Sequence, residues 1–452
     1  MHRVPWIFCL SDVGWLVWAK QSPVSLVLWV LCFVGHLGIW CVAFNRIHAT
    51  ALPRKFRKQS EKVIVPIVAL PVAYVLVWMS FQFDTTFDSN FLASKAYMGL
   101  TVVLSFYFIG RWAHRRFITG LPAAVVSSER VWLDIKERVS EQFFNGAAPQ
   151  LLGMVPFNEA SKLTLQKHTF AFDMPAELEG FKICQLSDLH LTGHICIEYF
   201  EEIVKEANQF EPDIVVITGD IIDESVCLSW FESTIGKLTA KYGVFYILGN
   251  HDQRVGDEAM LRSMIEALGL VAVSGAWHEI NVDGAKIVIT GNELPWFRAV
   301  DDLPPPAEQP ESDFAILLSH SPDQFEWALN YKFDVMFAGH THGGQIAFPI
   351  VGPIVAPSRY GVSYAAGTYQ MDSMLMHVSR GISGDEAIRV NSPPGVRTVH
   401  VDGQATIVLD AANRLVSGGI LRRILQLKTK FHDVLLPLFL ENVDVVTFEN
   451  LF

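Results

Sequence analysis

The stretch VMFAGHTHGGQ, Val335 to Gln345, joins four apolar residues to a turn that carries two histidines and three glycines. A short apolar run that ends at a glycine predicts a buried strand. His340 and His342 are two residues apart, so in extended backbone their side chains point to the same side and can approach one metal ion. A polar loop with two surface histidines is the alternative, and this stretch alone does not decide between them.

The same pattern, a β-rich apolar run followed by polar residues, occurs five times along the chain. The five segments are FKICQLSDLH, DIVVITGD, VFYILGNHD, FAILLSH and FDVMFAGHTH. Helix-like stretches lie between several of them, at 197–210 and 257–268. Strands that alternate with helices predict an α/β layered domain, in which sites collect on loops after the carboxyl ends of the strands. The five polar clusters are therefore expected to meet.

These clusters contain a set of imidazoles, carboxylates and one carboxamide, with no thiolate. The candidate residues are Asp188, His190, Asp220, Asn250 with the adjacent His251, His320, His340 and His342. Such nitrogen and oxygen donors suit Mn, Fe or Zn. They are too many for one ion, and a bridging carboxylate holds two ions about 3.5–4 Å apart, the spacing that clamps both oxygens of a phosphoryl transfer. Asp220 is the expected bridge.

The ordered motifs DLH, GDIID, GNHD, LLSH and GHTH resemble the calcineurin-like metallophosphoesterase superfamily, over roughly 181–401. The resemblance implies a four-layer α/β/β/α sandwich and two divalent metal ions, Mn, Fe or Zn. It assigns one ion to Asp188, His190, Asp220 and His342, and the other to Asp220, Asn250, His320 and His340. It also gives His251 a role in stabilising the transition state or protonating the leaving group, and Asp223 the role of orienting His251. Asp252 is expected to cap a helix.

Three further motifs, GHTHGGQIAFP, SRGIS and RVNSPPGV, are similar to the membrane-anchored bacterial branch of this superfamily. That branch includes the UDP-2,3-diacylglucosamine pyrophosphatase of lipid A synthesis and exported phosphodiesterases. Because an anchored site meets membrane-resident molecules most often, we expect a lipid-linked or nucleotide-linked phosphodiester or pyrophosphate as substrate, with UDP-2,3-diacylglucosamine as the specific candidate. TGNELPW and PPGV depart from the usual sequences of the branch. Neither departure touches an expected metal ligand, so they leave the reaction class unaffected and the substrate open.

Hydrophobic residues are concentrated near the N-terminus. Apolar runs at 24–44, 63–83 and 96–113 predict about three transmembrane helices. Basic residues lie between the first two runs and after the third, which places the catalytic domain in the cytoplasm by the positive-inside rule. His36 lies within the first run, where it would be costly in lipid unless it faces the other helices. The expected location is a bacterial inner membrane, with a multi-pass anchor.

The domain organisation follows from these patterns. We expect a transmembrane region over 1–120, an amphipathic linker over 121–162 with a connector helix over 127–153, the catalytic domain over 163–410 and an amphipathic tail over 411–452. The net charge is −12, with the acidic excess in the catalytic part, which argues against nucleic-acid binding. The six cysteines show no C-x-x-C spacing and predict no disulfide framework. No protein partner is evident.

The sequence thus predicts a membrane-anchored, dinuclear metal-dependent phosphoesterase that hydrolyses a phosphodiester or pyrophosphate bond. A hypothesis from another class is a membrane receptor or scaffold that binds a phosphate ligand at the metal site with weak turnover or none. The acid role expected of His251 and Asp223 argues for the enzyme, since a binder needs no leaving-group acid.

Overall fold

The computed structural model describes residues 23–80, 92–139, 142–298, 301 and 303–402. The chain divides into two compact units, of which the first comprises residues 1–108 and 122–405. In the second unit, the described residues are 109–121, which contain the end of a helix and the π-helical turn His114–Ile118. Residues 1–22 of the expected transmembrane region and the expected tail 411–452 lie outside the described residues.

The described residues of the N-terminal region form three helices: α2 (Pro23–His48), α3 (Arg54–Ser80) and α4 (Leu92–Ala113). Within the described residues, Val27–His48 is the helix that is long and apolar enough to cross a membrane. A helix of this kind near an N-terminus suits a membrane anchor or a signal sequence. The apolar runs predicted at 63–83 and 96–113 begin within α3 and α4, and their role as further spans stays a prediction.

His36 has polar partners on both neighbouring helices. Its Nδ1 lies 2.7 Å from the hydroxyl of Tyr97 on α4, and its Nε2 lies 3.2 Å from the carbonyl oxygen of Ile67 on α3. The side chain is buried. His36 therefore faces the other helices, which is the condition under which an imidazole is tolerated in an apolar helix.

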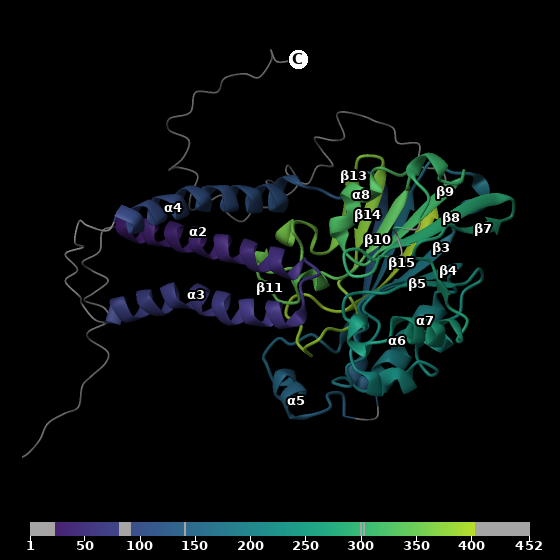
Figure 1. Cartoon of the computed structure of the whole chain (residues 1–452), viewed down its shortest axis with the longest axis horizontal. Helices are drawn as coiled ribbons and strands as arrows, with labels where there is room; N and C mark the ends of the chain where they lie inside the picture. The colour runs from purple at the N-terminus through teal and green to yellow at the C-terminus, as the bar shows by residue number, and fades with distance from the viewer. Residues whose placement is uncertain (1–22, 81–91, 140–141, 299–300, 302, 403–452) are drawn as a thin grey trace, which may run out of the picture. The chain divides into compact units, whose positions relative to one another are not determined.

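Two mixed sheets form the catalytic domain (Figure 1). The first sheet runs in the order β1 (Val125–Asp134), β2 (Lys162–Ala171), β15 (Gly395–Asp402), β3 (Lys182–Leu186), β4 (Ile214–Thr218), β5 (Val244–Ile247) and β6 (Val271–Ala272). The second runs in the order β13 (Gly367–Met371), β14 (Met374–Val378), β10 (Val335–Ala338), β9 (Phe314–Ser319), β8 (Ala285–Asn292) and β7 (His278–Val282). A small ribbon pairs β11 (Ala347–Phe348) with β12 (Gly352–Pro353).

Three apolar clusters define the layers. One packs α6 (Ile197–Gln209) and α7 (Glu258–Glu266) on the first sheet, where alternate residues such as Val215 face the helices. The next residue, Val216, faces the second cluster between the two sheets. The third cluster lies on the outer face of the second sheet, beside α8 (Phe325–Ala328). Figure 1 shows α6 and α7 together on one side of the domain. The predicted four-layer α/β/β/α sandwich is confirmed.

The segment before the predicted domain is not a connector helix. Residues 125–134 form β1, which pairs antiparallel with β2 from Val125↔Phe170 to Asp134↔Lys162. The only α-helix among the described residues of 121–162 is the short α5 (Ala147–Gly153). Because β1 is exposed along most of its length, its mixed apolar and polar residues also suit a surface helix. These residues form a strand and not a helix because their backbone pairs with β2, and sequence periodicity contains no information about that pairing.

All five strands predicted to carry the polar clusters are present, as β3, β4, β5, β9 and β10. The first three run parallel in one sheet, and β9 and β10 run parallel in the other. Parallel strands present their carboxyl ends at one edge of each sheet, so the loops that follow them are brought together.

Candidate metal centre

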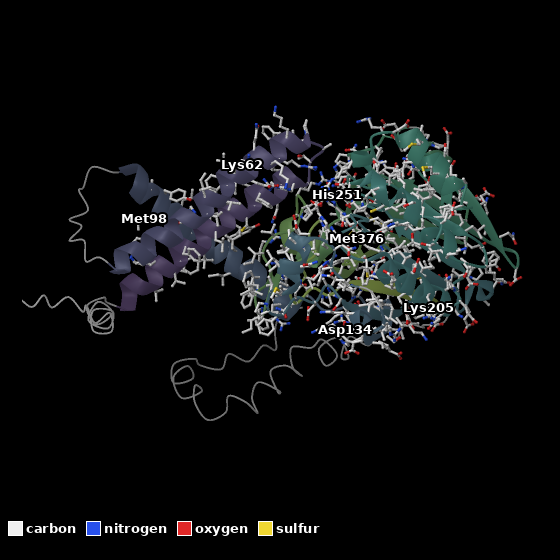
Figure 2. The ribbon with its side chains drawn as sticks, turned by 90° about the horizontal axis from the view of Figure 1, so that it is seen from below. Lys62, Met98, Asp134, Lys205, His251 and Met376 are labelled. Atoms are coloured by element: carbon white, nitrogen blue, oxygen red, sulfur yellow. The ribbon has the colours of Figure 1, made fainter. Side chains whose placement is uncertain are left out.

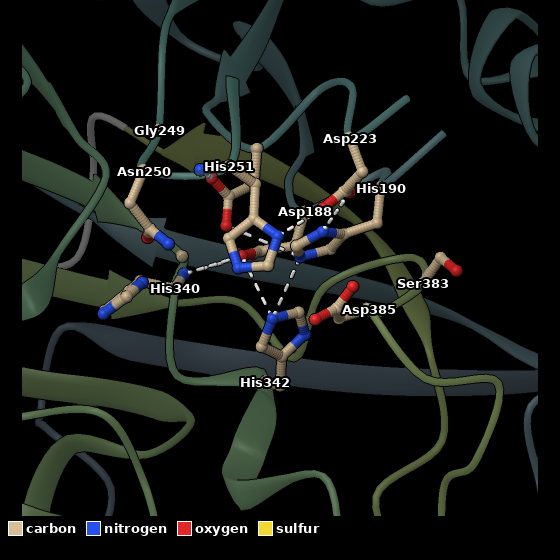
Figure 3. Close-up of polar contacts among 12 residues, drawn as sticks. Asp188, His190, Asp223, Gly249, Asn250, His251, His340, His342, Ser383 and Asp385 are labelled. Carbon is tan, nitrogen blue, oxygen red and sulfur yellow. Dashed lines mark hydrogen bonds and ion pairs between the residues drawn. The ribbon is translucent and has the colours of Figure 1, made fainter. Parts of the chain in front are cut away.

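The loops after these strands bring every predicted site residue to one place. Figure 3 labels Asp188, His190, Asp223, Asn250, His251, His340 and His342 at this centre. Asp188 and His190 follow β3, Asp220 follows β4, and Asn250 and His251 follow β5. His320 follows β9, and His340 and His342 follow β10. The histidines of the opening stretch are therefore not surface residues, because His340 is buried and His342 faces His190.

The first cluster consists of Asp188, His190, Asp220 and His342, whose donor atoms all lie within 4.8 Å of one another. His190 Nε2 lies 3.1 Å from His342 Nε2 and 3.5 Å from Asp220 Oδ2. His342 Nε2 lies 3.6 Å from Asp188 Oδ1. These separations leave the donor atoms arranged around a common centre, at which one cation can take four ligands.

The second cluster consists of Asp220, His320 and His340, again with all donor atoms within 4.8 Å of one another. His320 Nε2 lies 3.3 Å from Asp220 Oδ2 and 3.1 Å from the amide oxygen of Asn250. Asn250 thereby joins this cluster through an oxygen, the donor that a carboxamide offers a metal. Asp220 belongs to both clusters, as a bridging carboxylate would.

The backbone at the centre is strained. Asp188, His190, Asp220, His340 and His342 all have positive φ, between 47° and 68°. A non-glycine residue in this region costs on the order of 1–3 kcal/mol and persists where the surrounding structure holds it, often at a functional site. Five such residues in two donor clusters indicate that the loops are shaped for the site.

The donor atoms suit metal ions. His340 Nε2 is buried and has no hydrogen-bond partner among the described residues. His190 and His342 turn Nε2 atoms toward each other, although His190 already donates its Nδ1–H to Asp223 at 2.7 Å. Ring nitrogens held in this way, beside buried carboxylates, are the arrangement that a cation satisfies once it displaces any proton on them. The His and Asp clusters therefore fit a dinuclear metal site, built from nitrogen and oxygen donors only.

Asp223 connects the metal centre to His251. One carboxylate oxygen accepts a hydrogen bond from His251 Nδ1, and the other accepts one from His190 Nδ1. The backbone N–H of His251 donates to Asp220 Oδ1 at 2.7 Å. His251 is thus fixed at its ring and at its backbone. Its other ring nitrogen, Nε2, lies 3.4 Å from a guanidinium nitrogen of Arg254, and both residues line the pocket.

Burial and nearby charges raise the pKa of two of the histidines at the centre and lower the pKa of the other two. Burial lowers the pKa of His190 and His320, but Asp223 beside His190 and Asp220 beside His320 outweigh burial and raise both to about 9. Burial lowers the pKa of His342 and His340 well below the usual range, with further lowering from Arg389 at His342 and from His320 at His340. His340 and His342 are therefore neutral at pH 7, as metal ligation requires.

Asp252 does not cap a helix. Its buried carboxylate accepts the backbone N–H groups of Ile221 and Ile222 at 2.9 Å each and of Gly249 at 2.7 Å. These three groups belong to the loops after β4 and β5. Asp252 thus ties together the loops that carry Asp220 and Asn250, and the cap of α7 is Asp257, whose side chain accepts from the N–H of Met260.

Two arginines at the site were not singled out from the sequence. Arg254 pairs with both oxygens of Asp385, at 2.8 and 3.1 Å, and donates to Asp223 at 2.5 Å. Arg389 is buried, and its guanidinium contacts the ring and the carbonyl oxygen of His342 at 3.0 and 3.1 Å. Arg254 lies within GNHDQR and Arg389 opens RVNSPPGV, so motif position is a signal for both, but their partners are distant in sequence.

This fold and donor set define a class of metal-dependent hydrolases. The family model described as "Calcineurin-like phosphoesterase" matches residues 181–344, which contain both donor clusters. A relative from Bacillus subtilis (strain 168), the metallophosphoesterase YkuE, is 32% identical over 51% of this chain and 82% of its own length. The chain belongs to the calcineurin-like metallophosphoesterase family and is a metal-dependent phosphoesterase.

Two further relatives carry names that state an activity. The phosphodiesterase YaeI of Escherichia coli (strain K12) is 27% identical over 54% of this chain and 90% of its own length. The UDP-2,3-diacylglucosamine pyrophosphatase LpxG of Chlamydia muridarum (strain MoPn / Nigg) is 26% identical over 49% of this chain and 83% of its own length. The resemblance inferred from the sequence motifs is confirmed at the level of the family.

Proposed function

We propose that this chain is a membrane-anchored phosphoesterase that hydrolyses a phosphodiester or pyrophosphate bond at a dinuclear metal centre. The observation that carries the proposal is the membership of Asp220 in both donor clusters. Asp188, His190, Asp220 and His342 would hold one ion, and Asp220, Asn250, His320 and His340 the other. Two such ions, Mn, Fe or Zn, activate water and stabilise charge on the phosphoryl oxygens.

The residues of the chain divide the remaining work. His251 would donate a proton from Nε2 to the leaving group, because its Nδ1 is engaged by Asp223. Asp223 would hold the tautomer and orientation of His251 and, through its other oxygen, those of His190. Arg254, which lines the same pocket, places a positive charge beside His251 and is suited to attract the substrate's phosphate.

Membrane anchoring is supported by the apolar helix Val27–His48. We propose that it anchors the chain in a bacterial inner membrane, with the catalytic domain on the cytoplasmic side and with the apolar parts of α3 and α4 as further spans. An anchored active site meets membrane-resident phosphates most often. UDP-2,3-diacylglucosamine is the candidate substrate, supported by the likeness to a relative that bears this activity in its name.

The test is hydrolysis by the purified full chain in detergent with Mn. Bis-p-nitrophenyl phosphate reports phosphodiesterase activity, and release of UMP from UDP-2,3-diacylglucosamine reports the pyrophosphatase. We expect His251→Ala to retain about two metal ions per chain and to lose about 10²–10⁴-fold in kcat, the contribution of a general acid. His278→Ala, on the edge strand β7, is the matched control and should behave as wild type.

The outcomes separate the two hypotheses. A metal-loaded wild type that cleaves neither compound would favour the receptor or scaffold. Cleavage of the diester without UMP release would leave the phosphoesterase intact and exclude UDP-2,3-diacylglucosamine as substrate. Equal activity of His251→Ala and wild type would remove the acid role from His251.

A further inference from the structure

The pocket over the metal centre has a wall that does not come from the catalytic loops. Besides His190, Asp220 and His340, its lining includes Phe44 and His48 from the end of α2, and Arg57, Lys58 and Glu61 from the first turns of α3. The pocket has a volume of about 230 Å³. The α2–α3 connection is thus part of the catalytic pocket.

A specific hydrogen bond holds this wall. Asn45, one turn before the end of α2, is buried, and its side-chain oxygen accepts the backbone N–H of Ala356 at 3.0 Å. Ala356 is itself fully buried, and the neighbouring Val355 and Pro357 line the pocket. A buried carboxamide is costly unless it is hydrogen-bonded, so this contact favours one position of the helix end against the pocket loop.

The wall carries two cations and one carboxylate. Lys58 Nζ lies 3.7 Å from Glu61, and Glu61 lies 3.5 Å from His48 Nε2. Lys58 keeps about half of its side chain exposed, at 56%, so its ammonium can turn into the pocket. Exposed pairs of this kind contribute little stability and exchange partners easily. Arg57, partly buried, adds a second positive charge to the same wall.

We propose that Arg57 and Lys58 form an anion subsite, which binds a second anionic group of the substrate next to the phosphate that is cleaved. The inference rests on the proposed phosphoesterase function and deepens it by naming the substrate class, an anionic amphiphile whose head group carries two adjacent phosphates. The apolar helix Val27–His48 ends in the same pocket, so acyl chains in the bilayer would present such a head group there. A diester with one phosphate needs the metal centre only.

The subsite can be measured through inhibition, whether or not the inhibitor is cleaved. In the bis-p-nitrophenyl phosphate assay, UDP-N-acetylglucosamine offers two adjacent phosphates and UMP offers one. The variant is Arg57→Ala/Lys58→Ala. Its control is Lys55→Ala/Lys62→Ala, which removes the same charge from exposed positions of α3 outside the pocket lining; Figure 2 labels Lys62 on this helix.

We expect the ratio of the inhibition constants, UDP-N-acetylglucosamine over UMP, to rise about tenfold or more in Arg57→Ala/Lys58→Ala, the loss typical of hydrogen bonds to charged groups. The control should keep the wild-type ratio. Far-UV circular dichroism spectra and bound metal per chain should match wild type in both variants, which shows that they fold. A ratio equal in variant and control overturns the subsite. A wild type without turnover overturns the phosphoesterase function instead.

A second arm identifies the source of the anion. UDP-2,3-diacylglucosamine in the same detergent should inhibit wild type at a concentration at least about tenfold below that of UDP-N-acetylglucosamine, because acyl chains concentrate it at the micelle surface. The ratio of its inhibition constant to that of UMP should also rise in Arg57→Ala/Lys58→Ala. Equal inhibition by the lipid and the soluble compound would overturn the membrane-amphiphile class and assign the subsite to soluble pyrophosphates.

Discussion

Asp223 Oδ2 accepts the Nδ1–H of His190 at 2.7 Å, while the other oxygen of the same carboxylate accepts the Nδ1–H of His251. One buried carboxylate therefore fixes both a candidate metal ligand and the candidate leaving-group acid. Burial raises the pKa of Asp223, but His190 and His251 outweigh it, so the carboxylate stays ionised. Metal affinity and proton transfer are expected to depend on the same residue.

Replacing Asp223 by Asn should damage both properties together. The amide keeps the size of the side chain but can no longer accept from both imidazoles as a carboxylate. We expect metal affinity to fall by about 10–100-fold, the usual effect of losing a partner of a metal-bound histidine. With metal restored in excess, kcat should still be about 10²-fold or more below wild type. Titrated metal content and kcat measure the two effects.

Asp372→Asn, an exposed Asp to Asn change on the loop between β13 and β14, is the control for Asp223→Asn and should match wild type. An Asp223→Asn variant that recovers full turnover when metal is added would show that this carboxylate acts only through His190.

Gly339 is a position where any side chain should disturb the centre. A Cβ on Gly339 would lie 1.9 Å from the hydroxyl oxygen of Ser187 and 2.6 Å from Asp188 Oδ2. Gly339→Ala must therefore displace the candidate ligand Asp188, and we expect loss of at least one metal ion and of most activity. Gly120→Ala, where a Cβ meets nothing within 4 Å, is the matched control. Normal metal content in Gly339→Ala would show that the loop after β3 moves without cost.

Metal binding should release protons. The pKa of about 9 at His190 and His320 means that both imidazoles are protonated at pH 7 without metal, and a cation must displace these protons. We expect affinity to rise with pH between roughly 6 and 9, with about two protons released as both ions bind. Calorimetry in two buffers of different ionisation enthalpy counts the protons. Affinity that is independent of pH over this range would contradict the carboxylate-stabilised imidazolium at His190 and His320.

The stability of the metal-free fold should change with pH in the opposite direction to the metal affinity. Because the folded-state pKa values are raised above 6.5, these ion pairs stabilise the fold fully below pH 6.5, and their contribution is lost as the pH rises through about 9. Thermal unfolding with and without metal, followed from pH 6 to 9, should therefore show metal-free stability falling and the stabilisation by metal growing.

A separate pH effect should come from His168 in the core between the sheets. Burial, with the charge of Arg397, lowers the pKa of His168 to about 3, and neither ring nitrogen has a partner among the described residues. The neutral form thus favours the fold above pH 6.5, and this stability is lost as the pH falls toward 3. His168→Leu should be neutral or stabilising at pH 7 and should reduce the loss at acid pH.

Lys167→Leu, the adjacent exposed position of β2, controls for the added leucine in His168→Leu and should leave the pH dependence unchanged. Thermal midpoints between pH 4 and 7 make the comparison. A His168→Leu protein with the wild-type slope would mean that the fold does not lower the pKa of His168.

Much of the catalytic domain could be predicted from local sequence. Apolar runs such as 335–338 are long enough to be strands and too short for helices, and each is followed by polar residues that have no place in a core. The rule that parallel strands present their carboxyl ends together then predicts the meeting of Asp188, Asp220 and His340 without any coordinates. These side chains do lie together in the structure.

Other features could not be predicted because they depend on partners far away in sequence. Residues 125–134 mix apolar and polar side chains without a strict period, and only pairing with β2 makes them a strand. Asp252 has the sequence position of a helix cap, yet it holds two loops together because the folded strands bring three N–H groups to its carboxylate. Arg389 meets His342 across 47 residues.

The α/β class, the family and the candidate ligands follow from the amino-acid sequence alone, because strand periodicity and motif chemistry are local properties. The folded chain adds that Asp220 is shared by two clusters, that Asp223 contacts two histidines, and that Arg57 and Lys58 line the catalytic pocket. These relationships are set by distances between segments that are remote along the chain. Burial and packing fix those distances, and no local pattern contains them.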